Sequence, residues 1–519
     1  MPELDDLMTV STEALSDDEA MVHIAQLIDV SDDRGSASGL DRAGQVLDAL
    51  AARTLTLARQ ARIHYLRANM WDARYQQSGA GSTWTWGHPA LDGRILELRR
   101  CISHEGFADL DPVARAQAHT NLGNVLSHVG RFVEAIEAWD RALTIIPNFA
   151  MAHGNRGISL SFYANSLYDR GHGGILAAAA ICGLADACAP DTFLDSYGLE
   201  PALAAFNEHR LGLESMISVE AVAGSIDFDG PSLGRGKAER AYRRWVLNHR
   251  LFLNPLNDVA PFAIAGRDIL TLPSLVVGLD RGPGPPEVIA YYNLLKQEFI
   301  SARFAFYEGC SSEGVHFSDR EVLLYDTLDF SLHGRAVERL KTAFRNAYSV
   351  FDKAAFLLNR YLGLGHGERQ VSFRNLWFRT PKARELHPDL DGRENWPLRG
   401  LFWLSKDIFE DAFKTANTPD ARDVYELRNH LEHKFVTVHD AFNRAVSPFS
   451  MPAAQGTFDL SFDDLAAKTY RMLKLARASL IYLSLGVFAE EQRRRLGRGE
   501  GMIGTMPLYT VDDRAKRRD

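Results

Sequence analysis

Cysteine is scarce in this chain of 519 residues, which contains only four, at positions 101, 182, 188 and 310. They form no C-x-x-C pair and are too few for a fold that is stabilised by disulfide bonds. This usage is typical of a protein in a reducing compartment, so we expect a cytoplasmic location. We also expect no secretory signal, because residues 1–33 contain ten Asp and Glu but no Lys or Arg.

Long apolar runs are lacking as well. The most apolar window, residues 173–189, is rich in alanine, is interrupted by Asp186 and is too short to span a membrane. We therefore expect a buried helix there and no membrane partner.

An excess of positive charge is absent from the whole chain, whose formal net charge is −9. The first 33 residues account for this deficit, since the rest carries 58 Lys and Arg against 57 Asp and Glu. Within the rest, residues 335–384 hold eleven Lys and Arg against three acidic residues. Such a segment is either a solvated basic helix face or a surface that attracts a polyanion such as RNA.

Convincing alternating strands are lacking throughout, whereas apolar residues recur at helical spacing over most of the chain. We predict an all-α protein in which an array of helical hairpins precedes a C-terminal helical bundle. The expected bundle helices are residues 287–307, 336–361, 397–416, 421–445 and 462–495. We divide the chain into an acidic flexible leader, helical repeats, a connecting region with Gly/Pro-rich loops, the bundle and a basic tail: residues 1–40, 41–195, 196–285, 286–497 and 498–519.

One window has the spacing of a helical repeat. If Ala116 is position 1 of a 34-residue unit, Gly123, Ala135 and Trp139 occupy positions 8, 20 and 24, and Pro147 position 32. This resembles the tetratricopeptide (TPR) pattern, in which small residues let two helices approach and a large one fills the groove. Weaker hairpin patterns flank it, and we expect the array to bind a protein or peptide.

Familiar catalytic signatures are lacking. Residues 230–239 superficially resemble a phosphate loop, but Lys237 is followed by Ala238 and not by the hydroxyl that Mg²⁺ requires. No G-x-S-x-G elbow is present, and the segment H-L-E-H at residues 430–433 matches neither zinc-protease motif. We predict no cofactor and no metal, while a hydrolase that uses a metal on His430 and His433 is kept as an alternative.

Residues 424–436 place several polar and charged side chains on one expected helix. Val424, Leu427, Leu431 and Phe435 would form its apolar stripe. Asn429 and His433 are four residues apart and share a face, and only a long side chain such as Arg428 can reach back toward the imidazole. A histidine, a guanidinium and an amide suit phosphodiester chemistry. From spacing alone, however, exposed ion pairs explain the segment better.

Other segments of the sequence favour a functional site over exposed ion pairs. R-N-x-x-x-H at residues 428–433, together with "LFLNPLND" (251–258), the segment 341–364 and "LFWLSKDIF" (401–409), resembles a bacterial family of the HEPN superfamily (higher eukaryotes and prokaryotes nucleotide-binding) that follows TPR-like repeats. The resemblance covers roughly residues 240–490. It implies a homodimeric, metal-independent endoribonuclease, with a role in phage defence or stress response.

Carried over from that resemblance, Arg428 would bind the scissile phosphate, Asn429 would tune the site and His433 would act as general acid or base. Residues in matching segments could line the site: Asp352, Lys353 and Asp407. From the basic segment we take four candidates for contact with the RNA backbone: Arg339, Arg345, Arg360 and Arg374. Some relatives bind nucleotides without cleaving RNA, so a nucleotide-binding module and a silent scaffold for protein interactions stay open.

Overall fold

The computed structural model describes residues 3–193, 199–277, 284–380, 384–410, 420–446, 456–497 and 505–516. Four expectations fall partly outside these ranges. They concern Lys382 of the basic segment, the end of the predicted helix 397–416, the apolar stripe at Val424, whose side chain is not described, and parts of the tail 498–519.

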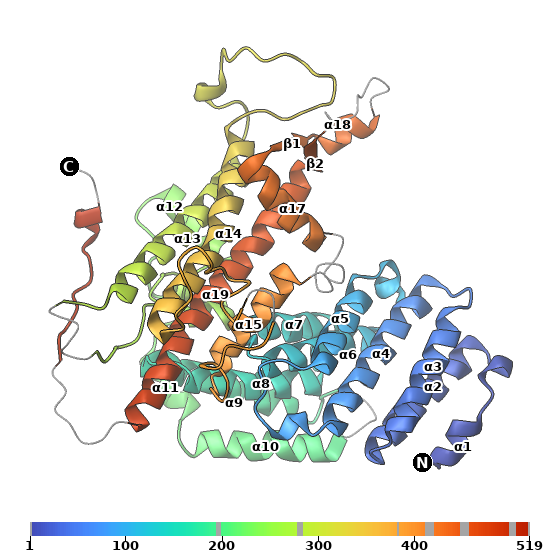
Figure 1. The fold of residues 1–519 in the computed structure, drawn as a ribbon. Helices are drawn as coiled ribbons and strands as arrows, with labels where there is room; N and C mark the ends of the chain where they lie inside the picture. The colour runs from blue at the N-terminus through green and yellow to red at the C-terminus, as the bar shows by residue number, and fades with distance from the viewer. Residues whose placement is uncertain are drawn as a thin grey trace.

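The part of the chain that the structure describes is all-α, as predicted, with 67% of it helical. The first helices, drawn in blue to green in Figure 1, are α1 (Leu4–Thr9), α2 (Asp17–Asp33), α3 (Ala37–Ala51), α4 (Leu57–Gln77), α5 (Pro89–Ser103), α6 (Pro112–His128), α7 (Phe132–Ile145), α8 (Ala150–Asn165), α9 (Arg170–Ala187), α10 (Leu199–Glu214), α11 (Val219–Ser225) and α12 (Lys237–Asn248). The later helices are α13 (Glu287–Ser311), α14 (Arg335–Leu362), α15 (Trp396–Phe409), α17 (Asp420–His433), α18 (Ala441–Val446) and α19 (Phe462–Leu496).

The acidic leader forms helices, which corrects the expectation that it is flexible. Ser16 and Glu19 form a capping box that starts α2, and the apolar face of α2 packs on α3 and α4 in a small core of its own. Asp17 and Asp18 form ion pairs with Arg59 of α4. The carboxylates that suggested a solvated leader therefore lie on the outer face of an amphipathic helix.

Three helical hairpins follow, α4/α5, α6/α7 and α8/α9. In the central one Gly123 lies against Trp139, so that a Cβ atom at Gly123 would approach the indole Nε1 to 2.6 Å. Gly93 packs in the same way on Trp71 in α4/α5, with 2.6 Å to the ring. The predicted repeat is confirmed, and its weaker neighbours are hairpins that use related packing.

The bundle helices α13, α14 and α19 begin and end within a few residues of the predicted boundaries. α19 is central, because it contacts α13, α14 and α15. Among the described residues it is the one helix with the length and composition of a membrane span, at a mean hydropathy of 1.4, yet 83% of that window is buried inside the protein. Its apolar character thus belongs to the core.

Two short strands were not predicted. β1 (Phe435–His439) and β2 (Thr457–Ser461) pair in parallel, with Phe435 opposite Thr457. The predicted helix 421–445 therefore ends at His433, and Phe435 is exposed instead of completing an apolar stripe. The aromatic and β-branched residues of the sequence F-V-T-V-H favour a strand, which explains the correction.

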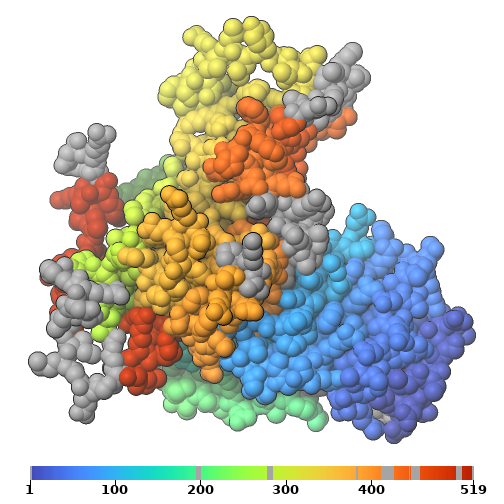
Figure 2. Space-filling model, viewed as in Figure 1, coloured from blue at the N-terminus to red at the C-terminus, as the bar shows by residue number. Residues whose placement is uncertain are grey.

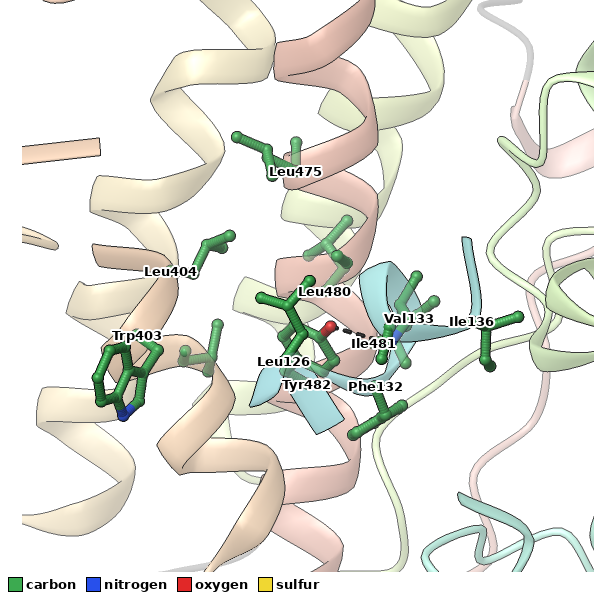
Figure 3. Packing of buried hydrophobic residues seen from close by; sticks show 14 of the residues in the cluster. Leu126, Phe132, Val133, Ile136, Trp403, Leu404, Leu475, Leu480, Ile481 and Tyr482 are labelled. Atoms are coloured by element: carbon green, nitrogen blue, oxygen red, sulfur yellow. Dashed lines mark hydrogen bonds between the residues drawn. The ribbon is translucent and has the colours of Figure 1, made fainter. Parts of the chain in front are cut away.

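The hairpins and the bundle share one hydrophobic core. Phe132 at the start of α7 stacks on Trp396 of α15 at 4.5 Å and meets the Tyr482 ring of α19 at 4.8 Å. The backbone N–H of Val133 donates to the Tyr482 hydroxyl at 3.1 Å (Figure 3). Gly130, at φ +88°, lies so close to α15 that a Cβ atom would come within 2.1 Å of the Trp396 carbonyl oxygen.

Residues from the predicted connecting region enter this core. The segment "LFLNPLND" is fully buried, and the Arg477 guanidinium of α19 donates to Asp258 at 2.6 Å and to the Phe252 carbonyl at 2.6 Å. Tyr163 of α8 donates to the same Asp258 carboxylate at 3.0 Å. One buried carboxylate thus links a hairpin to the central bundle helix.

Candidate functional site

α17 lies at one end of the bundle, packed on α14, α15, β1 and β2 (Figure 1). Leu427 and Leu431 are buried one turn apart and hold the helix against these elements. Asn429 and His433 lie on the side of the helix away from these leucines, whereas Arg428 lies at the flank that meets α14. The apolar spacing therefore determines which side of α17 reaches solvent.

Arg428 and Asn429 are in contact, since Nη1 of Arg428 donates to Oδ1 of Asn429 at 3.2 Å. Both side chains are partly buried, whereas His433 is exposed on the final turn. Asn429 and His433 are four residues apart on a helix, which places their side chains on one face. The guanidinium and amide thus form a pair, and the imidazole lies one turn away at the helix end.

Two residues of α14 organise this end of α17, and sequence analysis missed both roles. The Arg428 guanidinium lies over the Tyr348 ring, 5.6 Å from its centroid. Arg345 donates to the Leu431 carbonyl at 2.6 Å, which satisfies an acceptor in the last turn. Tyr348 and Arg345 are three residues apart on one face of α14, and only the packing of α14 on α17 reveals their function.

The His430 ring contacts its own helix and a neighbouring strand. Its Nδ1–H donates to the Glu426 carbonyl at 2.8 Å, and its ring lies 5.4 Å from that of Phe458 on β2. Within the described ranges, no three His, Cys, Asp or Glu residues are grouped as metal ligands. Among the residues that the structure describes, His430 and His433 therefore belong to no such group.

The three candidate lining residues are engaged elsewhere. Asp352 accepts from the Phe373 N–H at 2.9 Å, and Lys353 pairs with Glu298 of α13 at 2.5 Å. Asp407 is buried between the hairpins and the bundle, where it receives two hydrogen bonds from Arg99 at 2.6 and 2.8 Å and pairs with Arg131. These interactions give each residue a structural role.

Arg99 and Arg131 also explain the state of the Asp407 carboxyl. Burial raises its pKa, but the charges and hydrogen bonds of the two arginines outweigh burial and hold the pKa well below its usual range. The carboxylate is therefore ionised at neutral pH.

The basic segment is less cationic in three dimensions than in the sequence, because α13 packs along α14 and supplies glutamates. Arg339 pairs with Glu308 at 3.2 Å and Arg360 with Glu287 at 2.8 Å. Arg335 and Lys353 also pair with glutamates of α13. Of the four RNA-backbone candidates, Arg345 caps α17, and Arg374 is exposed on the loop after α14.

A buried polar cluster supports the strand that follows His433. His439 of β1 is bonded through Nδ1 to the Asp329 carbonyl at 2.7 Å and pairs through Nε2 with Asp459 of β2. Burial raises the pKa of Asp329, but hydrogen bonds from Thr327 and Ser331 outweigh burial and lower it to about 2. The cluster ties β1 and β2 to the segment before α14.

A cavity of about 270 Å³ lies between the hairpins and the bundle, lined by residues of α5, α6, α7, α15 and α19. His119 on its wall is 5% exposed, and its Nδ1 has no hydrogen-bond partner in the described part of the chain. Burial, followed by the charges of Arg141 and Arg115, lowers the pKa of His119 to about 4. This imidazole is neutral at physiological pH.

Residues 279–490 match the family described as LA2681-like HEPN, and residues 116–149 match the tetratricopeptide repeat. The chain therefore carries a HEPN domain of the LA2681-like family behind a TPR repeat, as the motif and its surroundings predicted. The HEPN match contains α13, α14, α15, α17 and most of α19, so Arg428, Asn429 and His433 lie inside it. Comparison with curated proteins gave no match, and comparison with solved structures gave none.

Proposed function

We propose that this protein is a metal-independent endoribonuclease whose site is formed by the last two turns of α17. The observation that carries the proposal is the arrangement of three groups inside the HEPN domain: Arg428 in contact with Asn429, and His433 exposed one turn away. The HEPN match supports the relevance of RNA, and the TPR repeat supports a protein or peptide partner that regulates cleavage. We place this activity in the cytoplasm, in defence against phage or in a stress response.

RNA carries its own nucleophile, so the proposed reaction needs few protein groups. The 2′-hydroxyl loses its proton and attacks the adjacent phosphorus, and the bond from phosphorus to O5′ breaks as O5′ receives a proton. The products are a 2′,3′-cyclic phosphate and a 5′-hydroxyl. In a homodimer, one His433 takes the first proton and its counterpart in the second copy supplies the other.

Arg428 and Asn429 would act on the phosphate and the ribose. A guanidinium binds phosphate oxygens and stabilises the charge that develops on them. Tyr348 lies over one part of the Arg428 guanidinium and Asn429 accepts from Nη1, so the group is oriented before RNA binds. Asn429 also has an amide NH₂ that can hold a ribose hydroxyl.

The test compares two histidines on the same helix. Full-length protein is incubated with single-stranded RNA in the presence of a chelator. We expect His433→Ala to lower the cleavage rate by about 10²–10⁴, the usual contribution of a positioned acid or base. His430→Ala is the matched control and should retain cleavage, because Nδ1 of His430 donates within its own helix. Equal rates for wild type and His433→Ala would remove His433 from the mechanism.

A non-catalytic scaffold is the second candidate. The pairing of four α14 cations with glutamates of α13 favours it, since those cations are neutralised before any RNA arrives. A scaffold leaves RNA intact at every protein concentration, so the cleavage assay separates the two functions.

A further inference from the structure

The cavity between the hairpins and the bundle is lined by more positive than negative charge. Hairpin surface, in blue, adjoins bundle surface, in orange, on the side of the molecule that Figure 2 shows. The charged residues on the cavity wall are four arginines and three carboxylates: Arg99, Arg131, Arg141 and Arg471, and Glu134, Glu137 and Asp407. Both modules supply these groups, so the cavity belongs to the folded whole chain.

The three carboxylates are already neutralised by neighbouring cations. The ion pairs join Asp407 to Arg99 and Arg131, Glu134 to Arg131, and Glu137 to Lys474 of α19. Negative charge on the wall is therefore balanced before any ligand arrives, and the excess charge is positive.

Arg141 carries unpaired positive charge. It is exposed on α7, and within the described part of the chain it forms no ion pair. Glu137, one turn earlier on the same helix, is held by Lys474 instead. His119 lies near Arg141, whose charge adds to burial in lowering the pKa of the imidazole. Because Nδ1 of His119 also lacks a partner among the described residues, two groups on one wall have unused hydrogen-bonding capacity.

The rest of the wall is apolar. Leu126 of α6 and Leu475 of α19 reach the cavity from the two modules (Figure 3), together with Ile102, Leu122 and Ala138. The volume of about 270 Å³ exceeds the roughly 150 Å³ of a cavity that holds benzene. A molecule that fits this space has an apolar body of about one aromatic ring and one polar group.

We propose that this cavity binds a small organic anion, with its anionic group on Arg141 and its apolar body against Leu126 and Leu475. A guanidinium binds phosphate and carboxylate groups alike through paired hydrogen bonds, so both are candidates for the anionic group. The excess of arginine disfavours a cation as the ligand. None of these residues takes part in the proposed cleavage of RNA.

Calorimetric titration of the full-length chain tests the site with four probes: phenyl phosphate, benzoate, inorganic phosphate and benzyl alcohol. We expect saturable binding of at least one of the two aromatic anions. Inorganic phosphate and benzyl alcohol should bind more weakly, because the first lacks the apolar body and the second lacks the charge. The comparison of phenyl phosphate with benzoate identifies the preferred anionic group.

Three variants locate the bound probe. Arg141→Ala should weaken binding of the aromatic anion about 10-fold or more, because it removes a charged hydrogen bond. Ser103→Trp places a large ring at the cavity wall and should also weaken binding. Arg170→Ala, at the start of α9 and outside the cavity, is the matched control that binds as wild type does. All three positions are exposed, so we expect an unchanged Tm.

The opposite results are equally clear. No saturable binding of either aromatic anion, or equal affinities in wild type and Arg141→Ala, would overturn the proposal. Inorganic phosphate or benzyl alcohol that binds as tightly as the aromatic anions would contradict it as well. RNA is absent from the titration, so failure of this site leaves the proposed cleavage standing, and intact RNA in the cleavage assay leaves this site standing.

Discussion

At the scale of single residues, the sequence indicated the candidate site residues but not the residues that position them. Arg428, Asn429 and His433 are recognisable because their spacing is local, within two turns of one helix. Tyr348 and Arg345 are about eighty residues away in the chain, and their roles depend on how α14 packs on α17. The same limit applies to Asp407, whose partners Arg99 and Arg131 belong to the hairpins.

Arg345 provides a test that separates positioning from RNA contact. Its hydrogen bond to the Leu431 carbonyl involves a charged donor, so we expect Arg345→Ala to lower the free energy of unfolding by about 1–3 kcal/mol. The salt dependence of RNA binding should not change. Arg374→Ala should leave the free energy of unfolding unchanged. It should reduce the slope of RNA affinity against salt concentration by about one, because it removes a phosphate contact. A reduced slope in Arg345→Ala would assign Arg345 to the RNA backbone.

His119 predicts a pH dependence of stability. Its pKa is about 4 in the folded protein, below the usual value near 6.5, so the unfolded chain binds the proton first. Stability is therefore full above pH of about 6.5 and falls as the pH decreases toward about 4, by up to about 3 kcal/mol. His119→Leu should flatten the Tm profile across this interval. An unchanged slope in the variant would contradict the assignment.

At the scale of elements, helices were predictable and the strands were not. Long apolar segments gave α13, α14 and α19 nearly complete. α14 has one continuous apolar face, whereas α19 is buried on every side between Leu475 and Val487. The end of α17 was not predictable, because residues 435–439 form a strand instead of continuing the helix. β1 forms only because β2 and Ser331 provide its partners.

His439 tests whether these elements form one unit. His439→Ala removes the bonds to the Asp329 carbonyl and the Asp459 carboxylate. We expect faster hydrogen exchange at residues 329–332, 435–439 and 457–461, with no change in α2 and α3. Faster exchange confined to β1 would show that residues 329–332 are held independently of this cluster.

At the scale of the whole molecule, the main difference from the sequence-based view is that the hairpins and the bundle share a core. Trp139, Trp403 and Tyr482 belong to one buried cluster that also includes residues from the predicted connecting region. Local patterns identify each module but cannot show that Gly130 touches α15. A partner bound to the hairpins would therefore act on a structure that is continuous with α15, which packs on α17.

Asp407 tests this continuity. Asp407→Asn removes the buried charge that Arg99 and Arg131 share and leaves Glu134 as the remaining acidic partner of Arg131. We expect a loss of up to about 3–5 kcal/mol in the free energy of unfolding. Because the core is shared, hairpins and bundle should melt in one transition that moves as a whole. Glu338→Gln, which breaks an exposed pair with Lys341, should cost less than about 1 kcal/mol. Two separate transitions, of which only one moves, would contradict a shared core.

The chemical ends of the cleaved RNA test the central claim most directly. Full-length protein is incubated with RNA in chelator, and the new termini are identified. The proposed mechanism predicts 2′,3′-cyclic phosphate and 5′-hydroxyl ends that disappear in His433→Ala. Intact RNA, or 3′-hydroxyl and 5′-phosphate ends that depend on a metal ion, would contradict it.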